Sequence, residues 1–509
     1  MSSISTTSPE STAAWYAEAE RARSAGHADR ARLLFERILG ADPTHADALF
    51  SCGLLALDSG ELEVAQYWIS RANECHPSAV FCETLCRIQL RLGVYARAAQ
   101  TARQGLTLAP DSVTLHYYRA LALQVEGKIE DAAPVYRRVL ELKPDHAFAH
   151  ANLGALARNL DALDDAERHL RRAIALAPDQ LGARANLATV LLSVGRYEEA
   201  WPLFEYRWAN FVEANGRPAQ GHPQLPLPQW KGEGGANLRT QRLLVTPEQG
   251  HGDSLQFVRY LSMATERFAQ VGYVCPPALL RLYEDSLSAH LPGLLLLDEA
   301  SVDARHWDWH CPLMSLPMAF GTRTNTIPAS SYLYADAARA ASWAARFGVL
   351  PEPALPRVGV VWAGGHSGLP EDKVRSMSAT QFAPLFTLKQ IRWVSLQKTD
   401  DPAKRADPAA TSCLIDWMDD VKDFADTAAL IENLDLVISV DTSVAHLAAA
   451  MGKPVWLLNR FAGCWRWLRG RDDSPWYPGM RLFTQTRKGE WSDVLDRIAA
   501  ALQVRFPAA

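Results

Sequence analysis

The sequence predicts an array of paired helices followed by two α/β domains, and three observations support that prediction. A turn residue recurs at spacings of 34, 33, 34, 34 and 34 positions: Gly26, Gly60, Gly93, Gly127, Asp161 and Gly195. An Ala follows each turn residue after five positions, and a Pro follows each of the first five after seventeen. Beyond about residue 240, short apolar runs typical of strands alternate with helical segments, which favours parallel sheets covered by helices.

The period and its three fixed columns resemble the tetratricopeptide repeat, a unit of two antiparallel helices. The Ala stands where the second helix must approach the first closely, and the Pro ends the second helix because it cannot continue it. Six repeats are expected over residues 12–214, at about 12–45, 46–79, 80–112, 113–146, 147–180 and 181–214. The resemblance implies a curved solenoid whose concave face holds a protein or peptide.

Both ends of the repeat region differ from its interior. The sixth repeat lacks the closing Pro and ends in aromatic residues, namely Trp201, Phe204, Tyr206, Trp208 and Phe211. A terminal repeat must cover its last apolar face, so we expect this tail to pack onto the segment that follows. Residues 1–11 are rich in Ser and Thr and are expected to be disordered, and no apolar stretch there reads as a signal peptide.

Composition excludes several classes of protein. The chain has 509 residues, 48% hydrophobic and 21% charged, which is typical of a soluble globular protein of two or three domains. A net charge of −5 without a basic block argues against nucleic acid as a partner. The sequence contains no run of about 18 apolar residues, so it predicts no membrane span.

One cluster could be tested as a metal site, namely Cys75, Cys82 and Cys86 with His76. Inter-helix packing explains Cys82 and Cys86 better than a metal does. Reduced thiols and a cytoplasmic location are the expectation.

The second half of the chain divides at two seams rich in Gly and Pro. Linkers are expected over 215–240 and 336–356, so that the α/β domains occupy 241–335 and 357–509. Expected strands of the first domain are 242–248, 271–275 and 294–297, with a helix over 254–268. Expected strands of the second are 357–363, 391–396, 434–440 and 454–458, with helices over 424–433, 443–451 and 491–506.

The first motif with chemical potential is EQGHGD, between a strand and a helix. Gly250 and Gly252 let the backbone turn tightly and approach a ligand, and Asp253 either caps the helix or points into a cleft. The third Gly of a dinucleotide fingerprint is missing, and no acidic residue closes the next strand. A dinucleotide-dependent dehydrogenase is therefore not indicated.

The second motif is VISVDTSVAHL, in which a buried strand ends in Asp441, Thr442 and Ser443 and a helix begins at once. Hydroxyl groups and free N–H groups at a helix start form an anion site that suits a diphosphate. His446 lies one turn into the helix, on the same side as Thr442 and Ser443. The alternative is an ordinary helix cap with a packed histidine.

The third motif is the loop WAGGHSGLPEDKVRS, which leaves a strand through paired glycines that include Gly364. It ends with two cations, Lys373 and Arg375, which could clamp a phosphate. The alternative is an ordinary solvated loop.

Together the three motifs resemble the bacterial heptosyltransferase-type glycosyltransferases, which have the two-domain GT-B fold with an interdomain cleft. The segment ISVDTSVAHLAAAMGKPVWLL carries the resemblance most strongly. The resemblance implies that Asp253 is the general base. It also implies that the nucleotide-sugar donor is bound by Asp441, Thr442, Ser443 and His446, and that Lys373 or Arg375 neutralises the donor phosphate. No D-x-D triple occurs, so neither a metal nor another cofactor is indicated. The first α/β domain is shorter than the family's, so repeats are expected to supply part of the acceptor surface.

Three functions remain open at this point. The first is a protein glycosyltransferase whose repeats recruit a polypeptide, since bacterial enzymes of this general type glycosylate flagellin subunits. The second is a transferase that acts on a saccharide or a lipid-linked glycan. The third is a non-catalytic scaffold with a degenerate transferase half.

Overall fold

The computed structural model describes residues 9–210, 225–288, 290–352, 354–365, 374–398 and 413–508. The sequence expectations for residues 1–8, for residues 211–224 including Phe211, and for Lys373 concern positions outside these ranges. The chain forms two compact units, residues 1–157 with 164–180, and residues 158–163 with 181–509.

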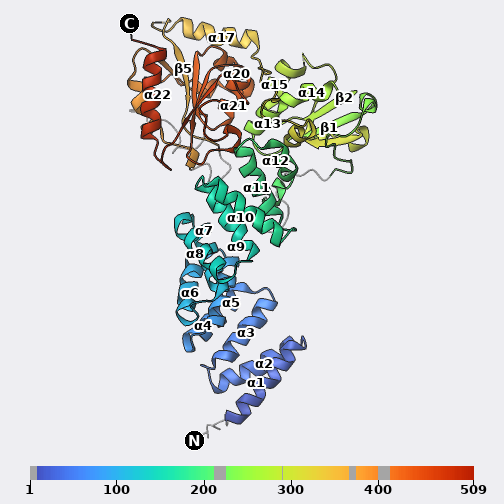
Figure 1. Cartoon of the computed structure of the whole chain (residues 1–509), viewed down its shortest axis with the longest axis vertical. Coiled ribbons are helices and arrows are strands. Elements are labelled where there is room, and N and C mark those ends of the chain that lie inside the picture. Colours follow the sequence, from blue (N-terminus) through green and yellow to red (C-terminus); the bar gives the residue numbers. More distant parts are fainter. Residues whose placement is uncertain are drawn as a thin grey trace. The chain divides into compact units, whose positions relative to one another are not determined.

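Unit 1 consists of antiparallel helix pairs, as the repeat pattern predicts (Figure 1). The helices are α1 (Pro9–Ser24), α2 (Ala28–Ala41), α3 (Ala46–Asp58), α4 (Leu62–Cys75), α5 (Ala79–Arg91), α6 (Tyr95–Leu108), α7 (Val113–Val125), α8 (Ile129–Leu142), α9 (Ala147–Asn159) and α10 (Leu163–Leu176). No helix in the described ranges is long and apolar enough to cross a membrane.

The columns of the repeat have the physical roles that the sequence assigns to them. The turn slot has positive φ at every repeat, including Asp161 at 60°, a conformation that Gly adopts without cost and Asp tolerates. The Ala five positions later is fully buried at every repeat. Cys82 and Cys86 lie in an apolar cluster with Ala102 and Leu115, which confirms the packing interpretation of these two cysteines.

Unit 2 begins with the last helix pair, α11 (Leu181–Ser193) and α12 (Tyr197–Phe204), followed by the short helix η1 (Arg207–Asn210). The aromatic tail packs onto the α/β part, as expected. The Trp201 indole donates to the Thr322 carbonyl at 2.7 Å, and the Trp476 indole donates to the Tyr197 hydroxyl at 3.1 Å. The Arg469 side chain also pairs with Asp161 of the fifth turn slot.

The first α/β half contains a four-stranded parallel sheet in the order β3-β2-β1-β4. Its strands are β1 (Arg242–Thr246), β2 (Gln270–Val274), β3 (Leu294–Leu297) and β4 (Trp309–Pro312). The expected single helix over 254–268 is broken into α13 (His251–Phe257), η3 (Val258–Tyr260) and α14 (Leu261–Thr265). Because the chain moves from β1 outward to β3 and then returns to β4 on the other side of β1, the topological switch point lies between β1 and β4.

The second α/β half contains a five-stranded parallel sheet in the order β6-β5-β7-β8-β9. Its strands are β5 (Arg357–Val361), β6 (Arg392–Ser395), β7 (Leu436–Val440), β8 (Val455–Asn459) and β9 (Met480–Thr484); its main helices are α20 (Phe424–Glu432), α21 (Ser443–Ala450) and α22 (Ser492–Arg505). Here the switch point lies between β5 and β7. Ligands of such sheets bind beyond the carboxyl ends of the strands at this point.

Both expected linkers contain ordered structure. Helix α17 (Ala337–Gly348) lies inside the expected linker 336–356. Its apolar side packs Trp343 against Trp417, with ring centroids 5.6 Å apart. In the first seam, Trp230 is fully buried between Phe268 and Phe320, and Gln229 forms a parallel bridge with His310 of β4. These residues extend the first half rather than only separating it from the repeats.

Candidate functional site

The EQGHGD motif follows β1 directly and therefore lies at the switch point of the first sheet. Gly250 is the N-cap of α13, and the Asp253 Oδ2 accepts the Gly250 N–H at 3.0 Å. Asp253 therefore does cap the start of its helix. Its side chain is nevertheless 18% exposed, so the carboxylate also reaches the surface of this turn.

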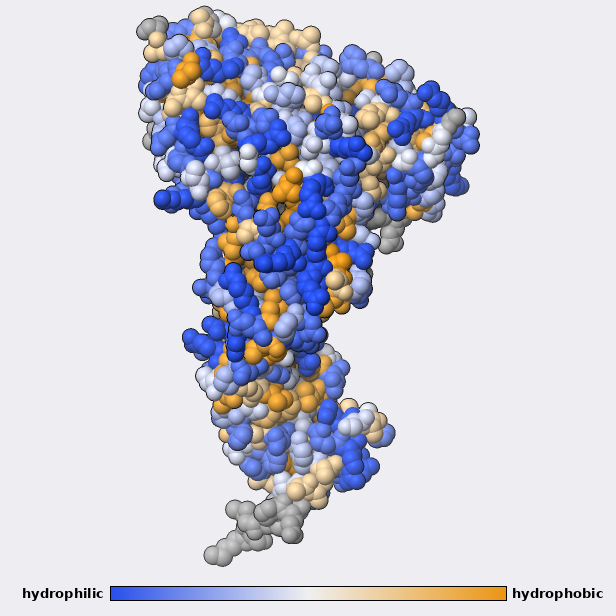
Figure 2. All heavy atoms as spheres, in the orientation of Figure 1, coloured by the Kyte–Doolittle hydropathy of each residue, from blue (hydrophilic) through white to orange (hydrophobic). Residues whose placement is uncertain are grey.

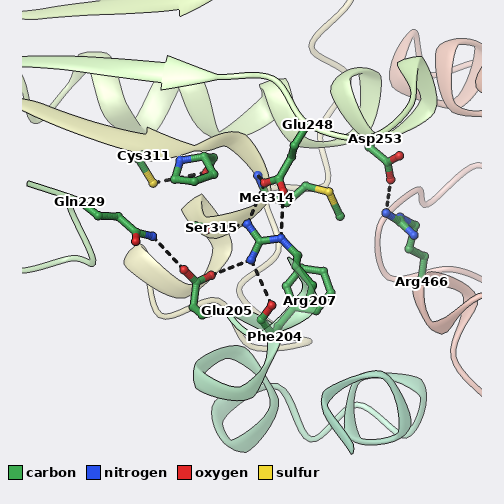
Figure 3. Close-up of polar contacts among 11 residues, drawn as sticks. Phe204, Glu205, Arg207, Gln229, Glu248, Asp253, Cys311, Met314, Ser315 and Arg466 are labelled. Atoms are coloured by element: carbon green, nitrogen blue, oxygen red, sulfur yellow. Dashed lines mark hydrogen bonds and ion pairs between the residues drawn. The ribbon is translucent and has the colours of Figure 1, made fainter. Parts of the chain in front are cut away.

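The second Asp253 oxygen forms an ion pair with Arg466, a residue outside the three sequence motifs (Figure 3). Arg466 belongs to η12 (Trp465–Trp467) and is 8% exposed. Its Nε donates to Gln256 Oε1 at 2.6 Å, and its Nη1 to Cys464 Sγ at 3.0 Å. Burial disfavours its charge, but Asp253 holds the pKa of Arg466 above its ordinary value.

The first residue of the motif, Glu248, is buried beneath this turn. Its two oxygens accept from Arg207 of η1 at 2.9 and 2.8 Å, and one of them also accepts the Met314 N–H at 2.8 Å. Arg207 in turn donates to Ser315 at 2.8 Å and to Glu205 at 2.9 Å (Figure 3). The segment after the last repeat helix is thus bonded to the loop that carries Asp253.

The third and second motifs meet at the switch point of the second sheet. The Arg375 Nη1 donates to the Asp441 carbonyl oxygen at 3.0 Å. A Cβ on Gly364 would lie 2.6 Å from the Arg375 Nε, so this Gly makes room for the guanidinium. The Gly364 N–H donates to Ser376 at 2.9 Å, which ties the two ends of the loop together.

The hydroxyl groups of the second motif are arranged differently from one another. The Thr442 Oγ1 lies 2.9 Å from the Ser439 Oγ, so it bonds to the strand and does not cap α21 through its side chain. Ser443 is the first residue of α21, where backbone N–H groups have no acceptor within the helix. This turn therefore offers backbone donors more readily than the Thr442 hydroxyl.

His446 is buried in α21 and uncharged at neutral pH. Its Nδ1 lies 2.9 Å from the Tyr477 hydroxyl, its ring stacks on Trp467, and its Nε2 is 3.8 Å from the Asp441 Oδ1. Burial lowers the pKa of His446 to about 3, although the Asp441 carboxylate opposes this shift. Three guanidinium groups act in the same direction as burial: Arg466, Arg259 and Arg375.

The two halves bring these motifs together, because α13 packs against α21. A Cβ on Gly252 would lie 3.1 Å from the His446 Cδ2 and 3.6 Å from the Ser443 Cα. Gly252 therefore permits the close approach of the two helices. The arrangement places two carboxylates, a neutral imidazole and two guanidinium groups beside helix starts, which suits binding of a phosphorylated ligand and proton transfer.

Metal chemistry has no evident ligand set in the ranges that the structure describes. No group of three or more His, Cys, Asp or Glu side chains there could hold a metal ion. Arg466, Trp467 and Tyr477 lie in the segment WRWLRGRDDSPWYP, which is rich in aromatic and basic residues. That composition marks the segment but does not indicate which of its side chains reaches Asp253 or His446.

Family models match two parts of the chain. Residues 422–458 match glycosyltransferase family 9 (heptosyltransferase), and residues 16–80, 85–147 and 117–180 match the tetratricopeptide repeat. The glycosyltransferase match runs from α20 through β8, so it includes Asp441 and His446 and excludes Asp253.

Individual proteins are similar over parts of the chain. Protein FlbA of Caulobacter vibrioides is 28% identical over 342 residues, which cover 62% of this chain and 54% of FlbA. The chain thus spans about half the length of this curated relative. The structure of YrrB, described as a TPR protein with an unusual peptide-binding site, is 20% identical to this chain in sequence, with a TM-score of 0.32. The match covers 33% of this chain and 88% of YrrB. The structure of MamA is 18% identical in sequence, with a TM-score of 0.32, and the match covers 34% of this chain and 95% of MamA. The sequence motifs and the family matches agree that the chain combines tetratricopeptide repeats with a segment of the glycosyltransferase family 9 type.

Proposed function

We propose that unit 2 transfers a sugar from a nucleotide-sugar donor to a polypeptide that the repeats recruit. The observation that supports this most directly is the meeting of the two switch-point turns, with Gly252 of α13 against His446 of α21. One turn then supplies a carboxylate and the other supplies donors for a diphosphate, within one site.

The donor side of the proposed site is the start of α21. The backbone N–H groups after Thr442 and the Arg375 guanidinium would hold the diphosphate, and the neutral His446 would act as a hydrogen-bonding group. As the bond from the anomeric carbon to the phosphate oxygen breaks, the electron pair leaves with the diphosphate. Fixed positive groups stabilise the charge that develops there.

The acceptor side is Asp253. The acceptor hydroxyl forms the new bond to the anomeric carbon, and its proton passes to a carboxylate oxygen of Asp253. Because one oxygen pairs with Arg466 and the other accepts the Gly250 N–H, the acceptor must approach a lone pair that these bonds leave available. Arg466 is then a positioning residue that fixes the orientation of the base.

The repeats of unit 1 suit the recruitment of a polypeptide. Figure 2 shows hydrophobic side chains interrupting the hydrophilic surface over the repeat helices, and large exposed apolar residues of this unit include Tyr67, Val80 and Phe148. Exposed apolar groups on a repeat array favour contact with another protein.

The alternative function is a scaffold without transferase activity. The observation in its favour is that both Asp253 oxygens are already engaged, which is what a purely structural cap and ion pair would show.

Thermal denaturation with a panel of nucleoside diphosphates tests the donor site. A nucleotide present at 100 times its dissociation constant should stabilise the protein by about 2.7 kcal/mol. Arg375→Gln and His446→Gln should reduce this stabilisation, since each removes a group beside the proposed diphosphate. Absence of any response to the panel would contradict a nucleotide-sugar donor.

Transfer of a labelled sugar, with the nucleotide that the panel identifies, separates the enzyme from the scaffold. Asp253→Asn should lower transfer by roughly 10²–10⁴-fold while nucleotide binding persists. Asp336→Asn is a control for the loss of a helix-capping carboxylate, because Asp336 is the N-cap of α17 and accepts the Arg339 N–H, whereas Asp253 accepts the N-cap N–H from the third position of α13. Nucleotide binding without transfer in the wild type would favour the scaffold.

A further inference from the structure

A cavity of about 420 Å³ lies in the first α/β half, apart from the candidate site. Three segments form it: the residues around η3, the π-helix η5 (Glu284–Ser288) with His290 and Leu291, and the stretch 328–334. Its volume is within the range of about 300–1,000 Å³ that is usual for small-molecule sites. A π-helix is rare and often accompanies a functional site.

A buried arginine without a carboxylate partner lines this cavity. Arg259 is 3% exposed, and its N–H groups donate to the carbonyls of Gln256 at 2.8 Å, Pro328 at 3.2 Å and Trp476 at 2.7 Å. It also donates to the Tyr332 hydroxyl at 3.0 Å. The groups that act on its charge are tyrosines, and within the described ranges no Asp or Glu forms an ion pair with it.

The charge of Arg259 is thus balanced by dipoles and rings alone. Its guanidinium lies 4.7 Å from the ring centroid of Tyr332 and 4.6 Å from that of Tyr477. A buried cation is normally paired with an anion, because desolvation of an unpaired charge is costly. An anionic group that entered the cavity would provide the compensation that the chain does not.

The remaining lining combines hydroxyl groups with apolar and aromatic faces. Ser262 and Ser330 carry hydroxyls, Leu287 is apolar and buried, and Tyr334 stands edge-on to His290 with ring centroids 5.7 Å apart. Ser330, His290 and Tyr334 are exposed, so the cavity is open to solvent at this rim. Such a lining fits a ring that bears hydroxyl groups on its edges and an apolar C–H face.

The cavity is separate from the proposed donor turn. The Tyr332 hydroxyl donates to the Leu255 carbonyl of α13, and its N–H donates to the Ala450 carbonyl at the end of α21. Tyr332 therefore lies at the carboxyl side of both helices, whereas Gly252 and Ser443 meet at their amino ends. Occupation of the cavity would brace the contact between the two helices.

We propose that this cavity binds a small organic anion of monosaccharide size, namely a hydroxyl-bearing ring with one carboxylate or phosphate group. The carboxylate and the phosphate share the chemistry that Arg259 would recognise, and direct binding measurements with defined probes distinguish them. The inference concerns a second ligand site and does not depend on the proposed transferase activity.

Isothermal titration of the full chain with four probes tests the proposal: glucuronate, glucose 6-phosphate, neutral glucose and inorganic phosphate. We expect at least one of the two anionic sugars to bind. Glucose should bind at least about tenfold more weakly than that sugar, as for the loss of one charge-assisted hydrogen bond. Binding of glucose as tight as that of both anionic sugars would overturn the assignment, and so would the absence of binding by either.

Variants locate the binding. Ser330→Phe places a large ring at the exposed rim and should weaken binding of the anionic sugar by about tenfold or more. Ala329→Phe is the matched control, because this neighbour adds the same ring at a position outside the cavity lining, and it should bind normally. Unchanged binding in Ser330→Phe would place the ligand elsewhere and overturn the proposal. The response to nucleoside diphosphates should be the same in all three proteins, which separates this site from the donor site.

Discussion

The buried pair of Arg207 and Glu248 should determine how firmly the last repeat pair holds the first sheet. The two side chains are 4% and 0% exposed and share two hydrogen bonds of 2.8 and 2.9 Å. Arg207→Met would leave the Glu248 carboxylate buried, with the Met314 N–H as its remaining donor among the described residues. Removing one partner of a buried pair costs about 3–5 kcal/mol, since the other charge is left uncompensated.

Hydrogen exchange followed by mass spectrometry measures this cost locally, without requiring that a chain of several domains unfold in one step. A loss of about 3–5 kcal/mol corresponds to exchange roughly 10²–10⁴-fold faster in β1 and η1. Arg323→Met is the matched control. Arg323 pairs with Glu198 of α12 in the same unit, but their side chains are 60% and 69% exposed, so the loss should be at most about 1 kcal/mol.

The double variant Arg207→Met with Glu248→Met should recover part of the loss, because apolar side chains can replace a buried ion pair at little cost. If Arg207→Met accelerated exchange no more than Arg323→Met, the buried pair would not be what fixes the tail to β1.

Three further perturbations test the site itself. His446 has a pKa of about 3 in the folded chain against an ordinary value near 6.5, so it stabilises the fold above pH 6.5 and this contribution is lost as the pH falls from 6.5 toward 3. A pH series of denaturation midpoints should therefore show a smaller acid loss in His446→Gln than in the wild type; equal losses would contradict the buried neutral imidazole. Gly252→Ala should destabilise the α13–α21 contact by about 1–3 kcal/mol in urea denaturation, because its Cβ would meet the His446 ring at 3.1 Å. Gly250→Ala, whose Cβ would lie 3.6 Å from the Asp253 Oδ2, should cost clearly less. Tyr477→Phe should lower the thermal midpoint by an amount equivalent to about 1–3 kcal/mol, since it leaves the His446 Nδ1 without its 2.9 Å partner; an unchanged midpoint would show that this bond is dispensable.

Local patterns account for what the sequence could predict. The turn slot demands positive φ, so its period is visible even where Asp161 replaces Gly. The strands β1, β5, β7 and β8 each contain at least three consecutive apolar residues or a Gly among them, because both faces of a parallel sheet are buried. By contrast, β4 (WHCP) and β9 (MRLFT) contain polar residues at intervals and give no such run, so neither was predicted.

Long-range pairs account for most of what the sequence could not predict. Arg466 contacts Asp253 across 213 positions, and Arg207 contacts Glu248 across 41. No local period links such residues, because their approach depends on the order of strands in two sheets. The sequence does not predict helix α17 for a different reason: its Ala-rich sequence has the composition of a linker, and its buried Trp343 packs against Trp417, which is distant in the sequence.

The charges around His446 explain why this residue acts as an uncharged group. Among the described residues, three guanidinium groups lower its pKa and one carboxylate, that of Asp441, opposes them. Protonation would add a further cation to a buried region that is already positive, so the imidazole remains neutral and bonds to Tyr477. Of these guanidinium groups, Arg375 is the one bonded to the turn before α21, so a diphosphate bound there would complement its charge, whereas a neutral sugar would not. Asp441 has two roles in this arrangement: its carboxylate partly offsets the effect of the neighbouring cations on His446, and its carbonyl oxygen accepts a hydrogen bond from Arg375.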